Sequence, residues 1–418
     1  MNWQRFSSSE PTANRRIAGK SYRLCYDFPV TSLGIYVQVP FCQTKCTYCN
    51  FHTGVVSSAR FAPYIDAVVG EISQHLSLYA STGVSLLASL TDAVVDTVYI
   101  GGGTPSLLDP AHLQRVFDAL RANFATQLAE VTLEADPETI DATKAAAWAR
   151  AGINRISFGV QSFSDDELKS AGRMHRRADV YKAVPILREA GIPKISFDLI
   201  AGLPGQTGDT WRASLDELAA LAPDHVSIYL LEVDEGSRLG SELLRGGNRY
   251  SAAKVPTDEE MAESYEYACR FLDCAGYHHY EISNWAIPGH ESRHNLKYWR
   301  REPYLGFGAG AHSFSGAQRW ANAHDAAAYV AAIAETRLPI EQLEPVTAES
   351  ALEEELFLGL RQLDGIDLNR IELQYGVSVN PRFERLYSAG LVERDGQIIR
   401  LAPNKLSISN EVFVELMK

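Results

Sequence analysis

The sequence predicts an α/β protein built around a partial (β/α)6 barrel, with a C-terminal extension and a small winged-helix-like α+β domain. Runs rich in β-branched and aromatic residues predict six strands, at residues 34–39, 96–100, 131–135, 155–161, 194–200 and 225–233. Segments with helical spacing lie between them, at residues 63–78, 111–124, 138–151, 165–190 and 210–221. Such alternation requires a parallel sheet with right-handed crossovers, either doubly wound or rolled into a barrel. Six units favour a partial barrel.

Several predicted helices carry capping residues at their ends. Ser164 followed by Glu167 fits a capping box at the start of the helix over 165–190. Gly152 and Gly191 each follow an alanine near a helix end, where glycine adopts the left-handed conformation at little cost. These residues set the expected limits of the helices.

The rhythm of strands and helices changes beyond residue 257. A helix over 258–274 leads into an aromatic and His-rich stretch, and near Val346 a second helical pattern begins, which ends in a short hairpin around Asp395-Gly396. We therefore expect four parts: a flexible arm over 1–33, the barrel over 34–257, an aromatic and His-rich extension over 258–345, and a winged-helix-like domain over 346–418.

Composition narrows the classes of function. The 418 residues carry a formal net charge of −13, and no apolar run approaches the roughly 20 residues that span a bilayer. We expect a soluble, cytoplasmic protein, with peripheral membrane contact left open. Winged helices often bind DNA, but residues 346–418 hold 8 basic and 12 acidic side chains, so nucleic acid is not an expected partner.

Three of the six cysteines fall within eight residues, just after the first predicted strand: Cys42, Cys46 and Cys49. In parallel α/β folds, chemistry is placed at this carboxyl edge of the sheet. Sulfur ligands at this density favour zinc or an iron–sulfur cluster. His52 would complete a tetrahedral Cys₃His zinc site. Alternatively, three cysteines on a four-iron cube leave one iron without a protein ligand and free to bind a substrate.

The spacing Cys-x-x-x-Cys-x-x-Cys at this position resembles the signature of the radical S-adenosylmethionine (SAM) superfamily. This resemblance implies a [4Fe–4S] cluster whose open iron is chelated by the methionine end of SAM. Gly101-Gly102-Gly103-Thr104-Pro105 closes the second predicted strand, and its glycines would let the backbone approach that ligand. A plain tight turn is the alternative for such a glycine run.

Later strands each deliver a polar residue near the carboxyl end: Glu134, Gln161 and Asp198. Singly, each could be a helix cap or a surface residue, but together they would ring one mouth of the barrel. Either carboxylate could accept from SAM hydroxyls or its amine, and Arg173 could pair with a carboxylate. Tyr48, inside the cysteine loop, could pack against adenine or in the ordinary core.

Further motifs point to one group within the superfamily. They are Tyr36-Val-Gln-Val-Pro-Phe-Cys42, Gly159-Val-Gln-Ser, Gly172-Arg-Met-His175 and Asp198-Leu-Ile-Ala-Gly-Leu-Pro-Gly-Gln206. From about residue 34 to Lys418 the chain resembles the HemN/HemW group, which contains oxygen-independent coproporphyrinogen III oxidases and HemW-type haem chaperones. Motif match implies these SAM contacts: Tyr36, Gly102, Gly103, Thr104, Glu134, Gln161, Arg173 and Asp198.

Two observations choose between the branches of this group. The oxidase pattern carries a fourth cysteine two residues after the third, but position 51 is Phe, so oxidase activity is not expected. The run His294-Asn-Leu-Lys-Tyr298-Trp299 resembles an element of the HemW branch, for which haem binding has been proposed. In one departure, Gln38 stands where both branches commonly carry His, and glutamine does not titrate.

The resemblance implies a haem chaperone with a [4Fe–4S] cluster and SAM, which delivers haem to acceptors such as respiratory haemoproteins. Five of eleven histidines lie between residues 277 and 314, among aromatic residues that suit a porphyrin. Core and surface histidines are the plainer interpretation of that cluster; the resemblance makes His294, Tyr298 and Trp299 the expected haem contacts. The alternatives are a coproporphyrinogen III oxidase and a zinc-stabilised interaction protein.

Overall fold

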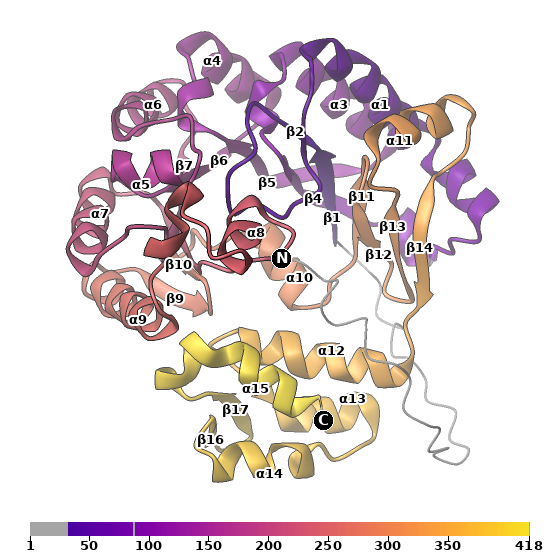
Figure 1. Cartoon of the computed structure of the whole chain (residues 1–418). Coiled ribbons are helices and arrows are strands. Elements are labelled where there is room, and N and C mark those ends of the chain that lie inside the picture. Colours follow the sequence, from indigo (N-terminus) through magenta and orange to yellow (C-terminus); the bar gives the residue numbers. More distant parts are fainter. Residues whose placement is uncertain (1–31, 87, 418) are drawn as a thin grey trace.

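The computed structural model describes residues 32–86 and 88–417, which are organised around one twelve-stranded sheet (Figure 1). Its centre is six parallel strands in chain order: β1 (Ser32–Val39), β4 (Val94–Gly102), β5 (Thr126–Ala135), β6 (Arg155–Gln161), β7 (Lys194–Ala201) and β8 (His225–Leu230). A doubly wound sheet would reverse its strand order part-way, and this one does not. The predicted partial barrel is therefore confirmed.

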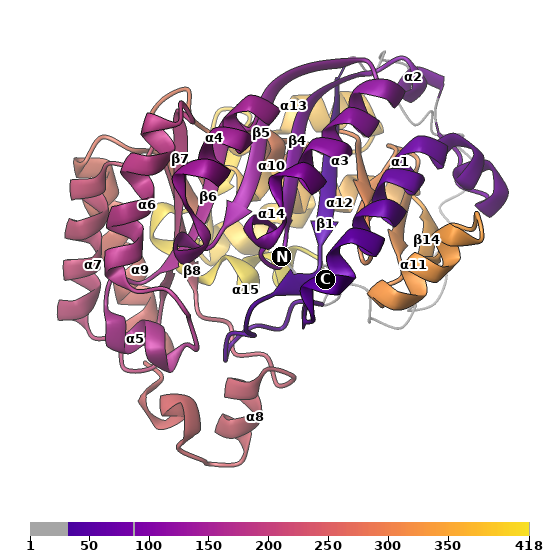
Figure 2. The ribbon, with the colours of Figure 1, turned by 90° about the horizontal axis from the view of Figure 1, so that it is seen from above.

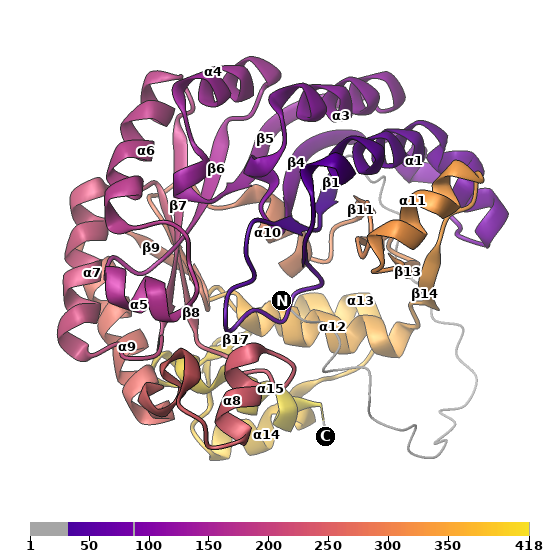
Figure 3. The ribbon, with the colours of Figure 1, turned by 45° about the horizontal axis from the view of Figure 1, so that its top comes forward.

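An arc of helices covers the outer face of the strands (Figure 3): α1 (Phe61–Thr82), α3 (Pro110–Asn123), α4 (Ala142–Ala151), α6 (Arg177–Glu189) and α7 (Gly208–Leu221). Each helix buries one apolar stripe; in α3 this includes Leu113, Val116 and Phe117. The short α2 (Ala88–Thr91) precedes β4. Within the described ranges, no helix has the length and apolar character needed to cross a bilayer.

The helix predicted over 165–190 is wrong as a single element. It is divided into α5 (Asp165–Ser170) and α6, and Gly172 between them has φ +76°, a left-handed conformation that suits glycine. The predicted capping box is also wrong: Ser162, not Ser164, donates to Glu167 Oε2 (2.6 Å) and accepts from the Ser164 N–H (2.9 Å). Gly152 ends α4 with φ +103°, as predicted.

Residues 258–345 extend both edges of the barrel sheet. After α9 (Asp258–Cys274), β9 (His278–Glu281) and β10 (Asn284–Ala286) add antiparallel strands beside β8. At the other edge, β11 pairs parallel with β1 and begins a meander: β11 (Tyr304–Phe307), β12 (His312–Phe314), β13 (Gln318–Asn322) and β14 (Ile340–Pro345). The meander carries α11 (Ala326–Ala334), which lies beside α1 (Figure 1).

Two shorter helices lie apart from the arc of barrel helices. Figure 2 shows α8 (Arg238–Leu244) projecting from one side, and α10 (Arg293–Trp299) lies inside, between the barrel strands and the C-terminal region. The predicted arm over 1–33 lies outside the described residues except for Ser32 and Leu33, which begin β1.

The C-terminal region has winged-helix character, with helices packed on a three-stranded sheet in the order β15-β17-β16. Its elements are α12 (Ala348–Arg361), β15 (Ile366–Asp367), α13 (Leu368–Tyr375), α14 (Asn380–Ser388), β16 (Val392–Asp395), β17 (Ile398–Leu401) and α15 (Ser409–Leu416). The hairpin of β16 and β17 falls where the sequence predicts it, and Phe383, Leu386 and Ile399 are in the core.

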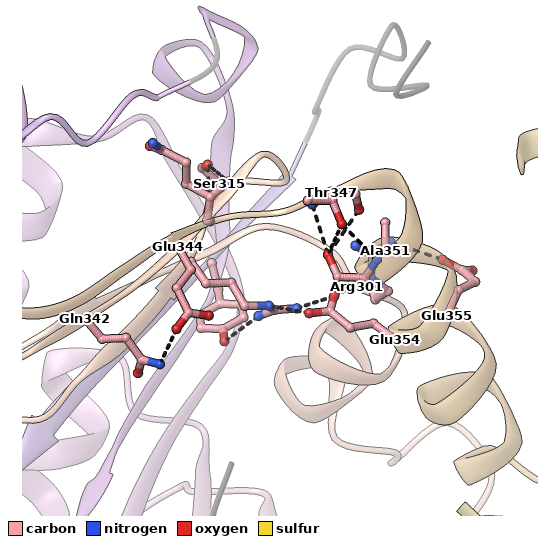
Figure 4. Close-up of polar contacts among 12 residues, drawn as sticks. Arg301, Ser315, Gln342, Glu344, Thr347, Ala351, Glu354 and Glu355 are labelled. Atoms are coloured by element: carbon pink, nitrogen blue, oxygen red, sulfur yellow. Dashed lines mark hydrogen bonds and ion pairs between the residues drawn. The ribbon is translucent and has the colours of Figure 1, made fainter. Parts of the chain in front are cut away.

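Charged side chains fasten this region to the barrel sheet (Figure 4). Glu354 on α12 accepts from both Arg301 Nε (2.8 Å) and Arg319 Nε (2.8 Å). The Arg319 guanidinium also lies 4.0 Å from the centre of the Phe314 ring. Arg301 follows α10, Arg319 lies on β13 and Glu354 lies on α12, so these contacts fix the meander and the C-terminal region against each other.

Candidate functional site

The cysteine loop leaves the carboxyl end of β1 and crosses the mouth of the barrel. Its ends are held together where β2 (Phe41–Cys42) pairs parallel with β3 (Gly54–Val55). Between them, the Thr47 N–H donates to Ala171 O (2.9 Å), and Thr47 O accepts from the Leu239 N–H (2.8 Å). The loop is thus anchored to the α5–α6 turn on one side and to α8 on the other.

The structure places all three predicted cluster cysteines on this loop as free, partly exposed thiols. The Cys49 N–H donates to Cys46 O (3.3 Å), which makes a tight turn. Burial raises the pKa of the Cys42 and Cys49 thiols. In the described part of the chain, no three His, Cys, Asp or Glu side chains are arranged to hold one metal ion. A four-iron cube fits three thiols that do not meet at one point, because each would bind a different iron.

His52, the fourth ligand of the zinc alternative, has a different neighbour. Its ring stacks on His324, with ring centres 3.8 Å apart. Burial lowers the pKa of His52, and the nearby His324 lowers it further. His52 therefore faces the β11–β14 meander, an arrangement that favours the cluster interpretation over a Cys₃His site.

Arg173 joins the cysteine loop to the barrel. One guanidinium nitrogen, Nη1, lies 3.4 Å from Cys46 Sγ, while Nη2 donates to Gly159 O (2.7 Å) and pairs with Asp136. Asp136 also accepts from Thr104 Oγ1 (3.1 Å). Asp136 was not predicted from sequence, although it stands only two residues after Glu134.

The glycine run at the end of β4 is more than a tight turn. Gly102 has φ +115° and donates its N–H to Glu134 Oε2 (2.8 Å). A Cβ on Gly102 would lie 2.6 Å from Gln38 Nε2, and one on Gly103 would lie 2.4 Å from Phe41 O. The absence of side chains therefore lets β4 close against the start of the cysteine loop.

This closeness gives a first prediction. We expect Gly103→Ala to push the Phe41 backbone aside, to lower the cluster content and to destabilise the fold by about 1–3 kcal/mol. Gly54→Ala is the matched control, because its Cβ would meet only Val56 Cγ1 at 3.9 Å. Iron content and urea unfolding curves measure both effects. Equal cluster content and stability in the two variants would contradict this role for Gly103.

Two half-buried carboxyl groups lie at the mouth. Glu134 accepts from Tyr99 Oη (2.9 Å), and burial raises its pKa to about 7. Asp198 accepts from Ser157 Oγ (3.3 Å), and burial raises its pKa to about 6. Acids with raised pKa values that converge on a barrel mouth are typical of functional sites.

Gln161, the last residue of β6, has φ +63°, a left-handed conformation that glutamine rarely adopts. Such a residue costs about 1–3 kcal/mol and is held by its surroundings. A Cβ on Gly159 would lie 2.8 Å from Gln161 Nε2, so the amide folds back over the strand end toward Arg173. The strain turns this side chain into the mouth.

Tyr36 and Gln38 form a closed pair on β1. Tyr36 Oη donates to Gln38 Oε1 (2.7 Å), and Tyr64 Oη donates to Gln38 O (2.8 Å). The other tyrosine of the predicted SAM site, Tyr48, packs beside the apolar cluster that contains Ala171. Gln38 is thus held by both its side chain and its backbone.

The three predicted haem contacts lie deeper, on α10. His294 is 1% exposed; its Nδ1 lies 2.9 Å from Thr97 Oγ1 and its Nε2 lies 2.9 Å from Tyr298 Oη. Burial lowers its pKa to about 3. Trp299 packs beneath the Arg361 guanidinium, 4.5 Å from the ring centre. Both imidazole nitrogens of His294 are therefore already engaged within the core.

Tyr99 connects α10 to the mouth, and the sequence reasoning missed it. Its hydroxyl bonds Glu134, while its ring stacks on His294 (5.4 Å) and on Tyr36 (5.9 Å). Its position could have indicated this role, because Tyr99 lies on the predicted strand two residues before the glycine run and on the same face as Thr97.

Comparison with known proteins agrees with this arrangement. The Radical SAM superfamily model matches residues 36–218, and the HemN C-terminal domain model matches residues 346–404. The heme chaperone HemW of Bacillus subtilis is 36% identical over 384 residues, which cover 90% of this chain and 97% of that protein. The chain belongs to the HemW family.

Other HemW relatives and one solved structure extend the comparison. The Escherichia coli heme chaperone HemW is 36% identical over 281 residues, covering 67% of this chain and 69% of that protein. The E. coli coproporphyrinogen III oxidase HemN, a radical SAM enzyme, superposes with a TM-score of 0.78 at 22% identity, covering 94% of this chain and 91% of HemN. This chain and HemN therefore share one fold.

Proposed function

We propose that the chain is a haem chaperone, which binds haem and passes it to acceptor proteins such as respiratory haemoproteins. The observation that carries this proposal is its relatedness, over nine tenths of its length, to proteins named heme chaperones. The mouth described above supports it, because it offers a ligand set for a [4Fe–4S] cluster and for SAM.

In this proposal, Cys42, Cys46 and Cys49 hold the cluster and leave one iron for SAM. When bound, the cluster supplies that open coordination position and an electron. Gly102 and Gly103 bring the backbone at the end of β4 to the methionine end of SAM, and Thr104 and Arg173 keep the wall rigid through Asp136. The remaining SAM contacts are Tyr36, Tyr48, Glu134, Gln161 and Asp198, which bring hydrogen-bonding and aromatic groups to the rest of the ligand.

The cysteine loop argues against the oxidase alternative. Phe51 stands where the oxidase pattern has its fourth cysteine, and its side chain is 51% exposed, so an apolar ring occupies that position. Gln38 stands where both branches commonly have a histidine, so it does not separate them; its amide oxygen accepts a hydrogen bond from Tyr36 Oη, and glutamine cannot exchange a proton near pH 7. Neither Phe51 nor Gln38 can act as a general acid or base beside the cluster.

The experiment that tests the proposal uses protein reconstituted without oxygen. Iron and sulfide analysis, visible absorption and haem titration are made on the same sample, which is then given reductant, SAM and coproporphyrinogen III. We expect a four-iron cluster, one tight haem site and no steady formation of protoporphyrinogen IX. Steady product formation would establish the oxidase, and a protein that binds zinc in place of iron would establish the interaction-protein alternative.

Glu134 makes SAM affinity depend on pH. Burial raises its pKa to about 7, so the group is largely protonated below that pH and is then a poorer hydrogen-bond acceptor for the SAM amine. We expect SAM affinity to rise as the pH is raised from 6 to 8, roughly as the fraction of ionised Glu134 rises. Equilibrium dialysis over this range measures it. In Glu134→Gln the affinity should be weaker and the slope absent; a slope unchanged in that variant would assign it to another group.

His294, Tyr298 and Trp299 remain the haem contacts that the sequence predicts. For His294 to ligate haem iron, one of its ring nitrogens would have to lose its hydrogen bond with Thr97 or with Tyr298. The His294→Ala variant, used below, decides whether that exchange happens.

A further inference from the structure

A group of histidines lies at the edge of the mouth where the cysteine loop meets the β11–β14 meander. His52 of the loop stacks on His324, which follows β13, at 3.8 Å between ring centres. His312 on β12 is near enough to both that, after burial, their charges help to lower its pKa to about 4. Glu341 Oε2 lies 3.9 Å from His324 Nε2. Three segments far apart in the chain thus bring three imidazoles together.

The two stacked imidazoles differ in how they are held. His324 is held against β14, because its backbone N–H donates to Glu341 Oε2 (3.2 Å) and its Nε2 lies 3.9 Å from the same oxygen. Its Nδ1 packs against Gly310, where a Cβ would lie only 2.8 Å away. His52 is exposed, and within the described residues neither of its ring nitrogens has a hydrogen bond. His52 is therefore free to bind a ligand, with His324 supporting its ring from behind. His294 is the opposite case, since both its nitrogens are engaged.

Apolar side chains on the same loop are exposed around His52. Phe51 is 51% exposed, Val55 59% and Val56 40%. Three neighbouring apolar side chains with this exposure form an apolar surface patch. A cation is at hand as well, because Lys45 Nζ donates to Phe51 O (3.3 Å). The edge thus combines one available imidazole, an apolar surface and a positive charge.

These three features match one class of ligand. Haem has a flat apolar ring, two carboxylates and an iron to which the protein needs to add only one ligand, because the porphyrin supplies four. A bare metal ion fits poorly, since no three His, Cys, Asp or Glu side chains among the described residues are arranged to hold one.

We propose that haem binds at this edge, with His52 as the protein ligand of its iron and His324 stacked behind that ring. Phe51, Val55 and Val56 contact the porphyrin, and Lys45 pairs with a propionate. This assignment rests on the proposed haem-chaperone function and gives that function a location. The cargo would then lie on the same loop as the cluster cysteines, three residues beyond Cys49.

The test is a haem titration of full-length reconstituted protein and its variants, followed by the Soret band. We expect His52→Ala and His324→Ala each to weaken haem binding tenfold or more. In His52→Ala, free imidazole should restore the wild-type spectrum, because it replaces the missing ligand. His278→Ala is the matched control, as His278 is an exposed histidine on β9 that faces Glu291. It should bind haem like the wild type.

The outcomes separate this site from the function on which it rests. Wild-type protein that binds no haem would overturn the haem-chaperone function itself. Wild-type binding with unchanged affinity in either His52→Ala or His324→Ala would overturn the site and leave the function standing. A loss seen in His294→Ala alone would place the haem on α10 instead. Because His324 lies outside the cysteine loop, its variant remains decisive even where His52→Ala lowers the cluster content.

Discussion

Replacing Cys46 by alanine is expected to remove the iron–sulfur cluster and, with it, the binding of SAM. Cys46 sits at the centre of the cysteine loop, where its sulfur lies 3.4 Å from Arg173 Nη1 and its carbonyl accepts from the Cys49 N–H. A four-iron cube left with two protein ligands is poorly held, and no other thiol of the described residues lies on this loop besides Cys42 and Cys49. We expect iron to fall from about four atoms per chain to near zero.

The matched control is Cys274→Ala, which removes an exposed thiol at the end of α9. It should keep the full iron content, the visible absorption of the cluster and the affinity for SAM. Iron and sulfide analysis after anaerobic reconstitution, with equilibrium dialysis of SAM, measures all three. A Cys46→Ala protein that keeps its cluster would show that the cluster is not bound by this loop.

The largest expected loss of stability comes from breaking a buried ion pair beneath α10. Arg155 on β6 and Glu130 on β5 are 1% and 0% exposed and lie 3.3 Å apart. Arg155 also donates to Ser196 Oγ (3.0 Å), and Glu130 accepts from the His294 N–H (3.0 Å). In Arg155→Met the Glu130 carboxylate loses its partner without gaining water, which costs about 3–5 kcal/mol.

Urea unfolding of the Arg155→Met protein measures this loss. The control is Arg177→Met, which breaks the Arg177–Glu217 pair (2.6 Å); because that pair is largely solvated, its loss should change stability far less than the loss of the buried pair. Similar unfolding midpoints for the two variants would contradict this prediction, because they would mean that neighbouring groups rearrange to compensate Glu130 for the loss of Arg155. Glu130 also supports the start of α10, so near-ultraviolet circular dichroism should change in Arg155→Met alone.

The central strands and the location of the site could be predicted because both follow from local sequence. Buried parallel strands are continuous apolar runs, and all six were found; the largest error is at β5, which begins five residues before the predicted strand, whereas β6 was found at its observed ends. The carboxyl ends of parallel strands lie on one edge, so Glu134 and Asp198 could be placed at one mouth from their positions alone. The spacing of the three cysteines was sufficient to predict the cluster loop without a structure.

The missed features depend on contacts between distant segments. Nothing local indicates that Arg173 must reach Cys46 and Asp136, which is why the break at Gly172 was predicted as continuous helix. Similarly, Ser164 has the residue type and spacing of a capping box, but Ser162 takes Glu167 first. The stacking of His52 on His324 joins the cysteine loop to the meander, and no spacing rule relates those positions.

The pairing of β1 with β11 also bears on how the chain is made. β1 is the first described strand to leave the ribosome, yet one of its two edges stays open until residues 304–307 have emerged. Through most of synthesis, that edge is an unpaired strand with free N–H and C=O groups, a template for pairing with another nascent chain. A product truncated before β11 would therefore carry the cluster loop and a complete row of barrel helices, but it would be expected to aggregate. We therefore expect this edge to need protection by a chaperone during translation.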